Sequence, residues 1–104
     1  LAQPATEVDL ELVLAVDVSR SMDYGEAVTQ RRGYIEAFRH AEVLDVIRSG
    51  LLGRIAVTYV EWSGPGLQAV VVPWMMIDGP ETGARFGDIL ERISALDREL
   101  STRA

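Results

Sequence analysis

The chain has 104 residues, a formal net charge of −6 and no cysteine. This length suffices for one small domain with one hydrophobic core. The absence of cysteine excludes a disulfide scaffold, and the acidic balance argues against nucleic acid, because no basic stripe is available to neutralise phosphates. All ten basic residues are arginine, so a lysine nucleophile is excluded. No apolar run approaches the ~18 residues of a membrane-spanning helix.

The first seven residues, 1–7, are interpreted as an N-terminal tail, and 8–104 as the domain. Small residues and a proline in "LAQPATE" are typical of the end of a secretory signal region. This predicts an exported protein, in the periplasm or outside the cell.

The first predicted strand covers 8–16, "VDLELVLAV", which alternates at first and then becomes continuously apolar. Such a run is typical of a strand buried on both faces in a parallel sheet. Asp23 and Glu26 form a capping-box pattern that starts a helix ending near Arg39 or His40. Arg31 and Arg32 are expected to face solvent on this helix. A second helical piece is predicted over 41–47.

Residues 54–62, "RIAVTYVEW", predict a second strand, and the short turn at 63–66 requires an antiparallel third strand over 67–72. Pro73 is expected to end this strand and to place it at the sheet edge. Glu61 is unusual inside an apolar strand, and either faces solvent or pairs with an arginine. A clear amphipathic helix follows over 83–100. Its apolar positions are Phe86, Ile89, Leu90, Ile93, Leu96 and Leu100.

The predicted order is β-α-β-β-α, which makes an α/β fold with an open, mostly parallel sheet and an antiparallel edge hairpin. The aromatic and sulfur side chains of the hairpin are expected to pack in the core and within the hairpin, with a partner-binding patch as the alternative. They are Trp62, Trp74, Met75 and Met76.

Three oxygen-bearing side chains follow the first strand at alternate positions: Asp17, Ser19 and Ser21. Alternate side chains of an extended segment lie on one side, so one carboxylate and two hydroxyls can converge on one point. Hard cations such as Mg²⁺ or Mn²⁺ prefer these donors. A single carboxylate leaves room for an anionic oxygen from a partner's Asp or Glu. The alternative is an ordinary loop whose Ser and Asp side chains serve turns and helix caps.

The stretch "DVSRSM" resembles the D-x-S-x-S signature of von Willebrand factor A-type domains. The resemblance runs from about Val8 to the last helix and implies the N-terminal half of a Rossmann-like A-type domain. It also implies that Asp17, Ser19 and Ser21 form the first loop of a metal-ion-dependent adhesion site. A Thr and a late Asp complete that site in the family, and no position here is assigned to them. Asp78 is interpreted as a helix cap. The amino-acid sequences of several segments also resemble those of a bacterial domain family of uncharacterised function with this fold.

An enzymatic function is not predicted. Phosphatases of the haloacid dehalogenase type need D-x-D and a lysine, whereas Ser19 replaces the second Asp here. Ser19 or Ser21 as nucleophile would need a base, and the only histidine, His40, is expected at a helix end far from the loop. The sequence therefore predicts a non-enzymatic, cation-dependent protein-binding module. The alternative is a structural or self-associating fragment whose metal site is incomplete and does not function, with association through an exposed strand edge.

Overall fold

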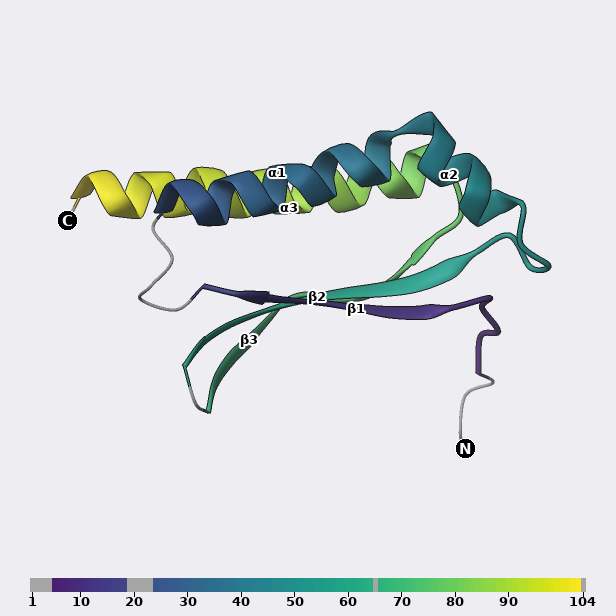
Figure 1. Cartoon of the computed structure of the whole chain (residues 1–104), viewed down its shortest axis with the longest axis horizontal. Coiled ribbons are helices and arrows are strands. Elements are labelled where there is room, and N and C mark those ends of the chain that lie inside the picture. The colour runs from purple at the N-terminus through teal and green to yellow at the C-terminus, as the bar shows by residue number, and fades with distance from the viewer. Residues whose placement is uncertain (1–4, 19–23, 65, 104) are drawn as a thin grey trace.

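The computed structural model describes residues 5–18, 24–64 and 66–103. In this part of the chain a three-stranded sheet carries helices on one face (Figure 1). The elements are β1 (Glu11–Asp17), α1 (Tyr24–Arg39), α2 (Ala41–Arg48), β2 (Ile55–Gly64), β3 (Leu67–Ile77) and α3 (Pro80–Arg103). The predicted α/β class and element order are confirmed, including the short helix after α1.

The sheet has the order β1-β2-β3, with β1 parallel to β2 and β3 antiparallel to β2. The mixed sheet with an antiparallel edge hairpin is therefore as predicted. Asp9 fixes where β1 begins, because its carboxylate accepts hydrogen bonds from the backbone N–H groups of Leu52, Gly53 and Arg54, at 2.9, 2.9 and 3.3 Å. These bonds, led by that from Leu52, hold the pKa of Asp9 below its ordinary value.

The hydrophobic core lies between the sheet and the pair α1 and α3, which run antiparallel to one another (Figure 1). Phe38 of α1 meets Phe86 of α3 edge to face, with 4.8 Å between ring centroids. Beneath them, Val57 and Tyr59 of β2 are fully buried. Alternation along β2 explains this, because every second side chain points to the helices.

The predicted burial of the first strand on both faces is wrong. Val16 is buried, but Val13 is 54% exposed on the other face of β1. In the described part of the chain the helices cover only one face of the sheet. β1 lies at an edge of the sheet and has β2 as its neighbour. The apolar run in the sequence therefore reflects two apolar faces, of which one is covered.

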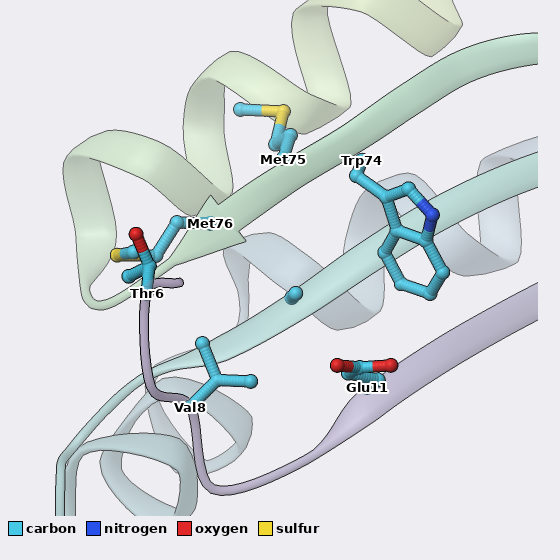
Figure 2. Close-up of a pocket in the computed structure, with 7 residues that line it drawn as sticks. Thr6, Val8, Glu11, Trp74, Met75 and Met76 are labelled. Carbon is cyan, nitrogen blue, oxygen red and sulfur yellow. The ribbon is translucent and has the colours of Figure 1, made fainter. Parts of the chain in front are cut away.

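The two tryptophans of the hairpin also lie outside the core, since Trp62 and Trp74 are 38% and 53% exposed. In Figure 2 the indole of Trp74 reaches from β3 across β2 toward the Glu11 carboxylate, and both line a cavity of about 380 Å³. Packing of these tryptophans in the core, as predicted from the sequence, is therefore wrong.

The third strand is longer than predicted, since β3 continues through Pro73 to Ile77. Proline is tolerated because β3 is the predicted edge strand, and because the pairing shifts register beside it, between Val57 and Tyr59. The hydroxyl of Thr58 donates to the carbonyl of Val72 at 2.7 Å in this irregular segment.

The amphipathic helix is confirmed as α3, with Phe86 and Leu90 fully buried. Leu96 is 55% exposed, contrary to prediction, because it lies at the margin of the apolar stripe centred on those two residues. Asp78 lies just before the helix, and its carboxylate accepts a hydrogen bond from the Thr82 hydroxyl at 3.0 Å. The Asp78 N–H in turn donates to the Thr82 hydroxyl at 2.9 Å, so Asp78 contacts the first turn of α3 through a side chain and not through a helix N–H group.

Candidate functional site

The candidate site lies at the carboxyl ends of the two parallel strands. Asp17 is the last residue of β1 and is aligned with Trp62 of β2. The pairing extends one residue further, where the Val18 N–H donates to the Trp62 carbonyl at 2.8 Å. β1 ends at Asp17, and the next described helix, α1, begins at Tyr24. Ligands of open α/β sheets bind at this end of the strands.

Of the three predicted cation ligands, Asp17 belongs to the described part of the chain, where it is half-buried. Ser19 and Ser21 lie outside the described residues. Within residues 5–18, 24–64 and 66–103, no group of three or more His, Asp or Glu side chains is arranged to hold a metal ion.

A buried polar cluster lies next to this strand end. Arg31 of α1 forms a bidentate pair with Glu61 of β2, with its Nε 2.7 Å from Oε2 and its Nη2 2.8 Å from Oε1. The Tyr59 hydroxyl donates to Glu61 Oε2 at 2.9 Å. Arg31 and Glu61 side chains are only 4% and 11% exposed. The pair therefore joins α1 to β2 in a nearly dry environment.

The expectation that Arg31 faces solvent is wrong, whereas Arg32 is exposed as predicted. The pairing of Glu61 with an arginine, one of the two readings of its position, is confirmed. A carboxylate inside an apolar strand was the sequence signal for this cluster. It did not identify the partner, because Arg31 and Arg32 are neighbours on the same helix.

The electrostatics of the cluster keep Glu61 ionised. Burial opposes its charged form, but hydrogen bonds from Arg31 and Tyr59 outweigh this and hold the pKa of Glu61 below its ordinary value. Burial, together with the hydrogen bond to Glu61, raises the pKa of Tyr59. Both carboxylate oxygens of Glu61 are thus occupied by protein donors.

A small cavity of about 250 Å³ opens beside the cluster, between the end of β2 and the start of β3. It is lined by Val18, Glu61, Ser63, Gln68 and Ala69. Val18, which follows Asp17 directly in the chain, is therefore part of the wall of this cavity.

His40 lies at the other end of the molecule, directly after α1, as expected for a helix-end histidine (Figure 1). Its Nδ1 accepts a hydrogen bond from the Glu42 N–H at 3.2 Å and caps the start of α2. His40 therefore lies far from Asp17.

None of the helices in the described part of the chain combines the length and apolar character that crossing a membrane requires.

Comparison with known proteins gives one match. No curated protein and no solved structure matches the chain significantly. A family model described as "Protein of unknown function (DUF1194)" matches residues 7–103. This match covers the sheet, all three helices and the strand end that carries Asp17, and the chain therefore belongs to the DUF1194 family.

Proposed function

We propose that the chain binds a protein partner through a divalent cation held by Asp17, Ser19 and Ser21. The observation that carries the proposal is the place of Asp17 at the shared carboxyl end of a parallel strand pair, in the connection between β1 and α1. The resemblance of "DVSRSM" to the adhesion-site signature of von Willebrand factor A-type domains supports the same residues.

The donor set suits Mg²⁺ or Mn²⁺, since all three side chains offer hard oxygen atoms. This set of three ligands is incomplete, because its single carboxylate neutralises only part of the charge of a divalent cation. Glu61 is the nearest further carboxylate along β2, but Arg31 and Tyr59 already occupy it. An Asp or Glu of the partner would therefore supply the missing anionic ligand.

The proposed module acts by binding and not by catalysis. A nucleophile needs a base within about 3 Å. His40 caps α2 at the far end of the molecule from Asp17. The chain has no lysine to accompany Asp17 in phosphoryl transfer. We further propose that the protein is exported and meets its partner in the periplasm or outside the cell.

Titration calorimetry with Mn²⁺ tests the cation site. We expect a dissociation constant of about 1 mM, because few protein ligands hold the ion. Asp17→Ala should abolish the binding heat. Asp45→Ala, which removes an exposed carboxylate from α2, is the matched control and should leave it unchanged. Micromolar binding that survives Asp17→Ala would refute the assignment.

A second candidate function is self-association through β1, and the contrast between the two sheet edges favours it. The β3 edge contains Pro73 and register shifts, both of which discourage pairing with another strand. The β1 edge, Glu11–Asp17, contains neither glycine nor proline and pairs in unbroken register with β2. It therefore offers a straight row of backbone groups to another strand.

Light scattering at micromolar concentration tests this candidate, and we expect a dimer. Antiparallel pairing centred on Leu14 would place Glu11 opposite Asp17 of the second copy, and like charges directly opposite are unfavourable. Glu11→Gln should therefore strengthen the dimer. A monodisperse monomer in both proteins would contradict self-association.

A further inference from the structure

A single residue, His40, separates α1 from α2 (Figure 1). Its backbone N–H donates to the carbonyl of Ala37 at 3.2 Å and so continues the last turn of α1. Its own backbone is extended, with φ of −77° and ψ of 128°, and α2 begins at the next residue. His40 is also the only histidine of the chain, and histidine is the side chain that ordinarily changes its charge between pH 5 and 8.

The first turn of α2 is attached to the rest of the molecule by few contacts. Among residues 41–48, all of which the structure describes, Leu44 alone is buried, and its Cδ2 lies close to Gly83 of α3. The first N–H groups of a helix have no partner within the helix. In α2 the N–H of Glu42 is bound by His40 Nδ1, at 3.2 Å. This side-chain cap therefore contributes much of what holds the turn in place.

The cap requires a neutral imidazole. Nδ1 can accept a hydrogen bond only through its lone pair, whereas an imidazolium carries a proton on both ring nitrogens. After protonation, the Nδ1–H of His40 and the N–H of Glu42 would be two donors facing one another. The partial positive charge at the start of a helix also disfavours a cation there. Protonation of His40 therefore breaks the cap.

The surroundings of His40 offer the imidazolium another partner. A cavity of about 400 Å³ lies beside the ring, and its charged lining residues are Glu36 of α1 and Glu42 of α2. Glu36 precedes His40 by four residues, the spacing at which an acidic and a basic side chain meet on a helix surface. None of the described residues of α3 lines this cavity.

Arg39, which directly precedes His40, is occupied by α3. Its guanidinium lies 2.6 Å from Asp88 Oδ1 and 2.7 Å from Glu91 Oε1. These two carboxylates offset the positive charge of Arg39. The acidic side chains that line the cavity are therefore left for His40.

We propose that His40 is a pH-sensitive latch between α1 and α2. The neutral ring caps α2, whereas the imidazolium releases the Glu42 N–H and turns to Glu36, which loosens the turn 41–44. Leu44 lies in this turn and packs at Gly83, so the loosening reaches the contact between α2 and α3. The latch depends neither on the proposed cation site nor on self-association.

Nuclear magnetic resonance from about pH 8 to pH 5 tests the latch, because the single histidine gives an unambiguous ring signal. The Glu42 amide and the His40 ring protons should change with the same midpoint. Protection of the Glu42 amide, relative to an unstructured amide at each pH, should fall about fivefold in acid. The amides of Leu52 and Gly53 are internal controls. They bind the carboxylate of Asp9, whose pKa lies below its ordinary value, and should not change.

Substitutions at the latch separate its two states. His40→Asn replaces the ring with a cap that accepts at every pH, so the Glu42 amide should stay protected throughout. His40→Ala should leave this amide unprotected throughout. Glu36→Gln removes the carboxylate that receives the imidazolium and should move the transition to lower pH. Glu11→Gln, on β1, is the matched control and should leave the transition in place.

Four results would overturn the proposal. A Glu42 amide that stays constant while the His40 ring titrates would show that the cap does not depend on charge. Equal changes at Leu52 and Gly53 would indicate a general loosening in acid. A transition that persists in His40→Asn would assign it to another group. Equal effects of Glu36→Gln and Glu11→Gln would exclude Glu36 as the partner of the imidazolium.

Discussion

At the scale of single residues, the pair Arg31–Glu61 is the interaction whose loss should cost most. Both side chains are nearly excluded from water, and removal of one partner leaves the other charged and buried. We expect Glu61→Gln to lower the free energy of unfolding by about 3–5 kcal/mol. Arg31→Met with Glu61→Leu should be less destabilised than Glu61→Gln, because no buried charge remains. Urea denaturation measures both.

The same pair sets a pH dependence. Folding lowers the pKa of Glu61 from 4.5, so its contribution to stability is present above pH 4.5 and is lost as the pH falls below it. The difference between the parent and Glu61→Gln should therefore shrink in acid. A constant difference from pH 7 down to pH 3 would mean that Glu61 does not carry the charge in the folded state.

At the scale of elements, α1 and α3 approach closely at Gly83. A Cβ at this position would clash with the backbone carbonyl oxygen of Phe38 and would lie 2.9 Å from Leu44 Cδ2. Because a backbone atom cannot move aside as a flexible side chain can, we expect Gly83→Ala to destabilise the protein by about 1–3 kcal/mol.

Gly33 is the matched control, since it also lies in a helix but a Cβ there meets nothing within 4 Å. Gly33→Ala should stabilise by about 0.5–1 kcal/mol through helix propensity. Thermal denaturation of the two variants should move the midpoint in opposite directions. A shift in the same direction for both would contradict the close helix approach.

The elements themselves were predictable because their signals are local. The helix periodicity around Phe86, the short turn after Trp62 and the capping signals all concern neighbours in sequence. Two predictions that were wrong, on the end of β3 and on the burial of β1, depend instead on contacts between distant parts of the chain. Continuation through Pro73 depends on which side of β3 faces an open edge, and the exposure of Val13 depends on which face the helices cover. A short stretch of sequence specifies neither the edge position of β3 nor the face that the helices cover.

In the candidate site, too, one feature was predictable from the local sequence and another was not. The position of Asp17 between a strand and a helix follows from local pattern, and the structure agrees. The pairing of Arg31 with Glu61 joins residues 30 positions apart, and its two hydrogen bonds depend on how α1 rotates against β2. Sequence reasoning identified Glu61 as unusual and left its partner undetermined.

At the scale of the whole molecule, the chain is a two-layer slab, with extents of 47 × 36 × 21 Å. In the described part of the chain the helices shield one face of the sheet, and β1 lies at an edge of the sheet with β2 as its neighbour. The proposed cation site depends on the acidic side chain of Asp17 at the end of β1. Partner selection by charge would therefore be sensitive to ionic strength.

The parallel pairing of β1 with β2 has a consequence for the order of folding. Glu11 lies opposite Ala56, so this contact closes a long loop, whereas the β2–β3 hairpin closes a short one. Because short loops form faster, we expect the hairpin to belong to the folding nucleus and β1 to dock after the main barrier. In stopped-flow experiments Val57→Ala should slow folding, and Leu14→Ala should mainly accelerate unfolding. Slower folding of Leu14→Ala would place β1 in the nucleus. With late docking, β1 joins the sheet after β2 and β3 have already paired.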